Sequence, residues 1–244
     1  MHLGDVVHPL PYTSSYKGAA EFANNLYLRL NNALYIAPGN HDIGDKCLPG
    51  NPAATISEES CKTYEGYFGE QWQSFERDGI CFVIVNSCLF GSGSEMEDKQ
   101  WTWFEKTLSE NSDKRIILFS HYPPFITDRN EENNYDNIDR GPRERLLAYL
   151  EKYNVEAIFS GHVHTFFLNE ISNTLSYALP SSTNFRQDYA EVFRVNPAEE
   201  FGRNDLGKFG FFIVDIYEEG HLSKFVRTNG SIEVLDAEKI SKPA

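Results

Sequence analysis

The sequence predicts an α/β fold whose C-terminal part is mostly antiparallel β-structure. Short apolar runs alternate with segments of helical periodicity as far as residue 164, and this alternation is typical of βαβ units with a parallel sheet. After residue 164, strand-like runs are separated by turn dipeptides instead of helices. We therefore expect one domain over residues 1–244, with an α/β half in 1–164 and a mostly antiparallel half in 165–244.

Four helices are expected in the first half because apolar residues recur there at helical spacing. They cover residues 18–33 with Ala19, Phe22, Leu26 and Leu30 inward, a stretch near 57–68, a stretch that follows Ser94, and a stretch that starts at Gly141-Pro142. Two pairs have the spacing of a capping box, Thr55 with Glu58 and Ser94 with Glu97.

The expected strands are short apolar runs, as in a sheet that is covered on both faces. In the first half they occupy residues 34–38, 80–85, 115–120 and 155–160, and residues 2–5 resemble the last step of another strand. In the second half they occupy residues 166–171, 175–179, 209–217, 222–228 and 231–235. We expect these later strands to form a second sheet that packs on the first.

Composition limits the classes of partner. The net charge is −14 and there is no basic cluster, which argues against nucleic acid or anionic lipid as a bulk partner. No apolar run approaches the ~20 residues of a membrane helix. The cysteines leave two readings open for Cys47 and Cys61, a disulfide or two free thiols. The oligomeric state is not indicated.

Four polar motifs follow the ends of expected strands. They are Gly4-Asp5, Gly39-Asn40-His41-Asp42, His121 and Gly161-His162-Val163-His164. Each motif alone could be an ordinary turn or loop, but their joint placement at carboxyl ends of strands is typical of an active site in an open α/β sheet. Asp, Asn and His side chains suit divalent metals that act on phosphate esters. Within the second motif, His41 could donate a proton while Asp42 fixes its tautomer.

Together these motifs resemble the calcineurin-like metallophosphoesterase superfamily. Residues 39–44, Tyr67-Phe68 and residues 80–87 are also similar to the branch of calcineurin-like phosphoesterase domain-containing protein phosphatases. The resemblance implies a four-layer αββα sandwich of two mixed sheets. It also implies metal-dependent hydrolysis of a phosphate mono- or diester in a phosphorylated substrate, through a dinuclear centre of Mn, Fe or Zn ions and a metal-activated hydroxide.

The resemblance also assigns roles to individual residues. Asp5 matches the carboxylate that bridges the two metals. One metal is matched by Asn40, His121 and His162, and the other by His164. His41 matches the acid that protonates the leaving oxygen, with Asp42 behind it.

One family motif is missing, because Asp-x-His occurs nowhere in the chain. In the family this motif lies on the first strand and supplies ligands of the metal that His164 serves. We therefore expect an N-terminally truncated chain that lacks the first strand, binds one metal well and a second poorly, and has weak activity or none. The alternative is a non-catalytic scaffold with the same fold.

Three arginines and two loops are candidates for substrate recognition. Arg140, Arg186 and Arg194 are candidate contacts to phosphate oxygens. The stretch 128–139 is acidic, rich in Asn and expected to be a mobile loop. The loops 128–140 and 181–208 are expected to shape substrate choice. The substrate itself stays open. The compartment is undetermined: the cytoplasm is slightly favoured, and secretion stays open because of the expected truncation.

Overall fold

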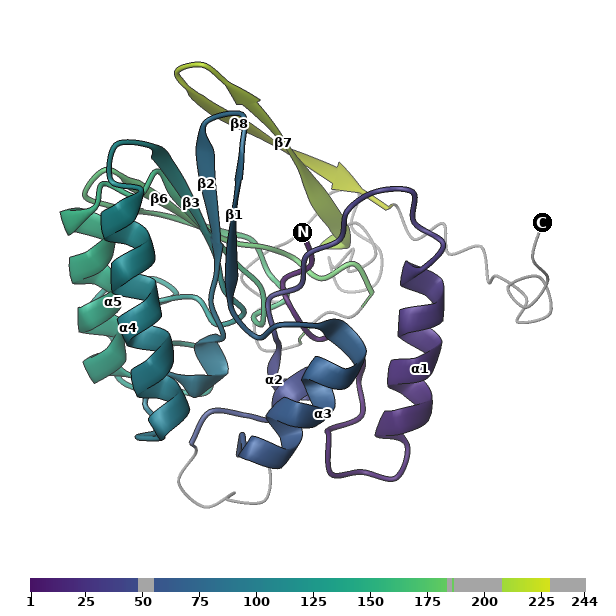
Figure 1. Cartoon of the computed structure of the whole chain (residues 1–244). Coiled ribbons are helices and arrows are strands. Elements are labelled where there is room, and N and C mark those ends of the chain that lie inside the picture. The colour runs from purple at the N-terminus through teal and green to yellow at the C-terminus, as the bar shows by residue number, and fades with distance from the viewer. Residues whose placement is uncertain (48–54, 184–185, 187–207, 229–244) are drawn as a thin grey trace, which may run out of the picture.

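The computed structural model describes residues 1–47, 55–183, 186 and 208–228. Its strands form a six-stranded sheet in the order β1-β2-β3-β4-β6-β5 and a two-stranded antiparallel sheet, β7-β8 (Figure 1). The strands are β1 Gln73–Arg77, β2 Ile80–Ile84, β3 Arg115–Phe119, β4 Ala157–Ser160, β5 Phe167–Ile171, β6 Thr174–Ala178, β7 Gly210–Tyr217 and β8 Gly220–Arg227. The predicted α/β class with two sheets is confirmed.

The centre of the large sheet is a parallel βαβαβ unit. Strands β2, β3 and β4 pair in parallel, and the two connections are α4 (Glu95–Glu110) and α5 (Arg140–Lys152). Figure 1 shows both helices side by side on one face of this sheet. Because the strands are parallel, their carboxyl ends share one edge, where the residues after β3 and β4 are placed together.

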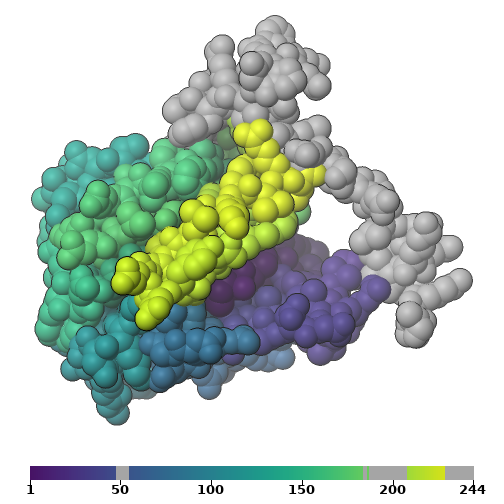
Figure 2. Space-filling model, turned by 90° about the horizontal axis from the view of Figure 1, so that it is seen from above, coloured from purple at the N-terminus to yellow at the C-terminus, as the bar shows by residue number. Residues whose placement is uncertain are grey.

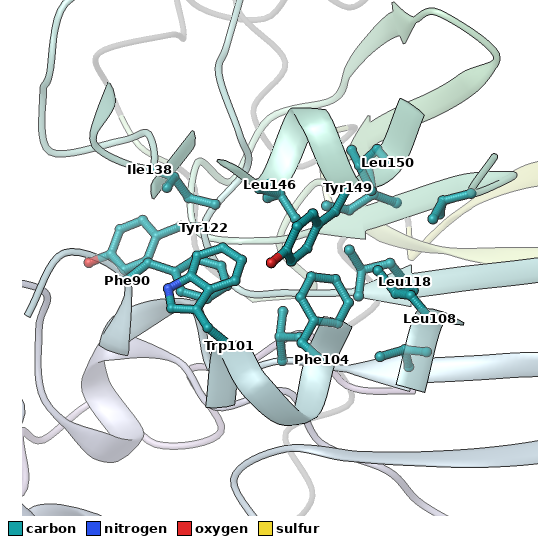
Figure 3. Close-up of a cluster of buried hydrophobic side chains, with 14 of the residues drawn as sticks. Phe90, Trp101, Phe104, Leu108, Leu118, Tyr122, Ile138, Leu146, Tyr149 and Leu150 are labelled. Carbon is teal, nitrogen blue, oxygen red and sulfur yellow. The ribbon is translucent and has the colours of Figure 1, made fainter. Parts of the chain in front are cut away.

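The core between these helices and the sheet is aromatic. Phe90 stacks on Trp101 with ring centroids 4.3 Å apart, and Phe104 and Tyr149 pack beside them (Figure 3). Each such buried side chain contributes about 1.5–3 kcal/mol relative to exposure. The helix α4 begins where predicted, because Ser94 Oγ accepts a hydrogen bond from the backbone N–H of Glu97.

The prediction that all strands after residue 164 build a second sheet is wrong for β5 and β6. Strand β6 pairs in parallel with β4, and β5 pairs antiparallel with β6, so both extend the large sheet. The physical reason is that β4 has a free edge, and the short β5–β6 hairpin places β6 beside it. The small sheet contains β7 and β8 among the described residues, and the predicted strand 231–235 lies outside them.

A polar network attaches the β7–β8 hairpin to the large sheet. Arg115 donates to both carboxylate oxygens of Glu156 at 2.6 and 2.8 Å. His221 of the hairpin lies 2.6 Å from the same carboxylate through Nδ1 and 3.1 Å from the Tyr177 hydroxyl through Nε2. Figure 2 shows the N-terminal residues recessed beside this hairpin.

The N-terminal helices differ in detail from the prediction. Helix α1 (Tyr16–Tyr27) is shorter than 18–33, and it buries Tyr16, Ala20 and Ala23. Two residues predicted to face inward, Phe22 and Leu30, are 53% and 51% exposed. The small side chains of Ala20 and Ala23 let this face approach its neighbours closely, and Tyr16 is buried in the same cluster.

Three local predictions need correction. Helix α3 (Glu58–Phe68) is capped by Ser57, whose hydroxyl accepts from the backbone of Ser60, and not by Thr55. The expected strand 34–38 is reduced to one parallel bridge between His2 and Ile36. The structure also contains elements that were not predicted, which are β1, the short helix α2 (Asn40–Ile43) and the 3-10 helix η2 (Ser87–Leu89).

The remaining predictions concern cysteines and membranes. All four cysteines are free, so Cys47 and Cys61 do not form a disulfide. Within the described part of the chain, no helix combines the length and apolar character needed to cross a membrane.

Candidate metal centre

Four of the predicted ligands meet at one point, although they come from distant segments of the chain. The Asn40 Oδ1 atom lies 3.0 Å from His121 Nε2 and 3.2 Å from His162 Nδ1. These two ring nitrogens are 3.2 Å apart, and Asp5 Oδ1 is 3.4 Å from His121 Nε2. The candidate ligand atoms of Asp5, His121 and His162 all lie within 4.8 Å of one another, so one cation could contact all three.

The backbone determines which ring nitrogens face this point. His121 Nδ1 lies 2.6 Å from the carbonyl oxygen of Leu3, and His162 Nε2 lies 3.1 Å from the carbonyl oxygen of Tyr135. A carbonyl oxygen only accepts hydrogen bonds, so each of these nitrogens carries the proton. Burial and the nearby His121 lower the pKa of His162 well below its usual range, so its ring is neutral. With its proton on Nε2, the neutral ring of His162 presents an unprotonated Nδ1 atom to the cluster.

The amide group of Asn40 is also oriented with its oxygen toward the cluster. Its Nδ2 donates to the Tyr135 hydroxyl at 3.0 Å and to Asp45 Oδ2 at 3.4 Å, which leaves its oxygen facing the two imidazoles. Two imidazole nitrogens, an amide oxygen and a carboxylate oxygen thus lie close to one another. Nitrogen and oxygen atoms of these kinds are ligands that fit Mn, Fe or Zn.

The turns that carry these residues explain the glycines of the motifs. A Cβ atom on Gly39 would lie 2.2 Å from the backbone nitrogen of Asp5 and 2.3 Å from its Oδ1 atom, so no larger residue fits. Asp5, His162 and His164 have φ angles of 55°, 65° and 56°, in the left-handed region that non-glycine residues rarely adopt. Strained backbone of this kind is concentrated at functional sites.

His164 lies in the same cleft but outside the tight group of four. Its Nδ1 atom is buried and has no hydrogen-bond partner within the described residues. Burial lowers the pKa of His164, while the Asp5 carboxylate opposes this shift. A buried nitrogen without a partner is costly, and a second cation near Asp5 would satisfy it.

The predicted contact between His41 and Asp42 is not found. The Asp42 carboxylate accepts instead from the backbone N–H groups of Gly39 at 3.0 Å and Val7 at 3.2 Å, because α2 turns it back toward the N-terminal loop. Burial and the neighbouring Asp5 raise the pKa of Asp42 to about 8. The Nδ1 atom of His41 contacts the carbonyl oxygen of His8.

The surroundings of His41 nevertheless suit a proton donor. The rings of His8 and His41 stack with centroids 5.0 Å apart, and both residues line the cleft. The backbone N–H of His41 donates to Asp5 Oδ1 at 3.0 Å, which ties the candidate acid to the candidate ligand. His8, a residue of the N-terminal loop, supplies the contacts that were expected from Asp42.

The three candidate arginines have different positions. Arg186 lines the cleft and forms an ion pair with Asp136. Arg140 is exposed on α5, where it pairs with Glu144 at 3.1 Å, and it is not among the residues that line the cleft. It lies at the start of the helix, and its side chain extends along the outer surface. Arg194 lies outside the described residues.

Sequence reasoning missed Tyr135 and Lys46. Tyr135 projects from the acidic loop (128–139) onto the ligand cluster, and the buried Lys46 anchors that loop at three points. This anchoring argues against the mobile loop that the composition suggested. A signal was present in the sequence, because Tyr135 is the single aromatic residue in the stretch 128–139.

The cleft extends from the ligand cluster between the two sheets and has a volume of about 1360 Å³. Its lining includes Arg186 and four of the candidate ligands, which are Asp5, His121, His162 and His164. The lining also has an apolar part, with Phe82, Phe119 and Phe159 of the large sheet and Val214 of the hairpin. A volume of this order can accept a small organic ligand beside the metal site.

Solved structures with this fold include a dimetal phosphatase from Danio rerio. It superposes with a TM-score of 0.55 at 14% identity, over 91% of this chain and 79% of that chain. GAP50, described as the anchor in the inner membrane complex of Plasmodium, superposes with a TM-score of 0.52 at 14% identity, over 96% of this chain and 85% of that one. At such low identity these similarities show the shared fold alone.

Curated relatives are more similar in sequence. The serine/threonine-protein phosphatase CPPED1 of Danio rerio is 28% identical over 176 residues, which cover 66% of this chain and 52% of the relative. A probable glycerophosphodiester phosphodiesterase, GpdQ, of Arcobacter nitrofigilis is 29% identical over 181 residues, which cover 67% of this chain and 59% of the relative. The chain thus spans about half the length of the phosphatase relatives that it matches.

The family model described as calcineurin-like phosphoesterase matches residues 1–166, which include all five metal-ligand candidates. This confirms the resemblance that the motifs indicated. The chain belongs to the calcineurin-like phosphoesterase family.

Proposed function

We propose that this protein hydrolyses phosphate mono- or diesters at a metal centre built on Asp5, Asn40, His121 and His162. The observation that carries the proposal is the convergence of one carboxylate oxygen, one amide oxygen and two imidazole nitrogens from four distant segments of the chain. Relatives with phosphatase and phosphodiesterase names support a phosphoric ester as the substrate class.

A metal ion in this site would polarise phosphoryl oxygens, and it would lower the pKa of a water molecule. It would also supply positive charge to a chain whose net charge is −14, so that an anionic substrate can approach. Asp5, Asn40, His121 and His162 would hold the first ion. We further propose that Asp5 and His164 share a second ion, which makes the centre dinuclear.

The two sites should differ in affinity because they differ in protein donors. Four side chains converge on the first site, whereas the second has Asp5 and the buried nitrogen of His164. We therefore propose that this chain binds one ion tightly and a second weakly, and that its turnover is low.

His41 is the proposed general acid. The His8 carbonyl accepts from His41 Nδ1, which leaves Nε2 as the atom that would give its proton to the leaving oxygen. Arg186 is the proposed contact to the phosphoryl oxygens. Its guanidinium already pairs with the carboxylate of Asp136, and two oxygens of a phosphate group would offer it a similar pair of acceptors.

The test is hydrolysis of an aryl phosphate and of a bis-aryl phosphate, with Mn, Fe or Zn at measured occupancy. Asp5→Asn and His41→Gln should each lower turnover by at least about 100-fold. Arg140→Gln should retain the parent rate because its side chain lies on the outer surface. Failure of the metal-loaded parent to hydrolyse either ester would remove the proposal. A chain that purifies without metal and takes none up would be a scaffold.

A further inference from the structure

We infer that Tyr135 is a positioning residue of the metal centre, acting on Asn40 and His162 from the acidic loop. This inference rests on the proposed metal site, but it concerns metal binding and not hydrolysis. Two different groups of Tyr135 contact two different ligands: the hydroxyl accepts from Asn40 Nδ2 at 3.0 Å, and the backbone carbonyl lies 3.1 Å from His162 Nε2.

The contact with Asn40 determines which end of its amide group, the oxygen or the nitrogen, faces the ligand cluster. An amide can present either oxygen or nitrogen to a cation, and only the oxygen binds one. The Tyr135 hydroxyl and the Asp45 carboxylate together hold the nitrogen away from the cluster. The hydroxyl contact is the shorter of the two, at 3.0 Å against 3.4 Å.

The contact with His162 acts on the tautomer. The carbonyl of Tyr135 keeps the proton on Nε2, so Nδ1 is free to bind a cation. The phenol ring also packs against the imidazole, with centroids 4.8 Å apart and an angle of 57° between the rings. This packing limits rotation of the imidazole.

Tyr135 can act in this way only if the acidic loop is held in place, and Lys46 holds it. The Lys46 side chain is 2% exposed, and its ammonium donates to the carbonyls of Asn134 at 2.7 Å and Asn137 at 2.5 Å and to Asp139 Oδ1 at 2.7 Å. These contacts use all three N–H groups of the ammonium and bracket Tyr135 in the sequence. The ligand set is therefore held ready before a cation binds.

The experiment is calorimetric titration of the full chain with Mn²⁺, combined with the visible absorption spectrum of its Co²⁺ form. Tyr135→Phe removes the hydroxyl but keeps the ring and the carbonyl. It should weaken binding of the first ion about tenfold, the lower end of what loss of an orienting contact to a metal ligand costs. The Co²⁺ spectrum should change because Asn40 is released.

Two further variants complete the experiment. Tyr12→Phe is the matched control, because Tyr12 is an exposed tyrosine outside the cleft, and it should bind Mn²⁺ as the parent does. Lys46→Met should weaken binding more than Tyr135→Phe, since it releases the whole loop. Thermal unfolding of each metal-free variant will show whether it is folded.

The outcomes separate this inference from the proposed function. If folded Tyr135→Phe binds Mn²⁺ as tightly as the parent and gives the same Co²⁺ spectrum, Tyr135 is not a positioning residue, whatever the rate of hydrolysis. If Tyr135→Phe binds more weakly but the metal-loaded parent hydrolyses no ester, the inference stands and the proposed function falls. A parent that binds no metal overturns the inference.

Discussion

Replacing His162 with alanine should abolish the thermal stabilisation that divalent metal gives to this protein. His162 Nδ1 lies 3.2 Å from both Asn40 Oδ1 and His121 Nε2, so its loss removes one of the four candidate metal-binding atoms of the first site. Three candidate metal-binding atoms remain, and the water or protein atoms that replace the imidazole bind the ion less well. The prediction concerns the difference between metal-loaded and metal-free protein, because the substitution also removes buried packing.

The size of the effect follows from linkage between binding and folding. A ligand present at 100 times its dissociation constant stabilises the folded state by about 2.7 kcal/mol. For a chain of 244 residues, each kcal/mol raises Tm by roughly 2–4 °C. Saturating Mn²⁺ should therefore raise the Tm of the parent by about 5–10 °C, and that of His162→Ala by less than about 2 °C.

The assay is differential scanning calorimetry in chelator and in excess Mn²⁺. His221→Ala serves as the control, because His221 is a histidine with a buried side chain in the hairpin network, away from the metal ligands. It should lower Tm in both conditions and retain the metal-induced increase. An equal metal-induced increase in His162→Ala and in the parent would show that the ion binds elsewhere and would refute the assignment of the site.

Three more outcomes are expected. Gly39→Ala should lose metal binding, measured by titration, because its Cβ would overlap the backbone and the carboxylate of Asp5. Burial raises the pKa of Glu156, but the contacts with His221 and Arg115 outweigh burial and lower this pKa from 4.5 to about 2. Glu156 therefore stabilises the fold above pH 4.5, and this contribution is lost as the pH falls toward 2. Glu156→Gln should therefore flatten the curve of Tm against pH in that window, and an unchanged curve would contradict the role of the network. Arg186→Gln should raise KM for an aryl phosphate about tenfold, by loss of one charge-assisted contact, whereas Arg140→Gln should leave KM unchanged.

Much of the fold could be predicted from local patterns. The apolar runs that became β2, β3 and β4 are separated by helical segments, and a βαβ connection makes the strands parallel. Parallel strands bring their carboxyl ends to one edge, so the approach of His121 to His162 was already implied by the positions of two strands. The convergence of His121 and His162, two of the candidate metal ligands, is in this sense a consequence of chain topology.

Other features depend on partners that are distant in sequence. The pattern of β5 and β6 shows a hairpin, but it does not show which free edge the hairpin will join. Nor does the spacing of His41 and Asp42 reveal that Asp42 turns to the backbone of Val7. In each case several partners satisfy the same local pattern, and packing selects one of them.

The sequence by itself determined the kind of chemistry, because only certain side chains bind metal ions and their motifs stand at strand ends. The tertiary structure decided how those side chains are used. The carbonyls of Leu3 and Tyr135 set the tautomers of His121 and His162, and the Tyr135 hydroxyl turns the Asn40 oxygen toward them. The direction of a lone pair depends on where a neighbouring acceptor lies in space, and that neighbour comes from another part of the chain.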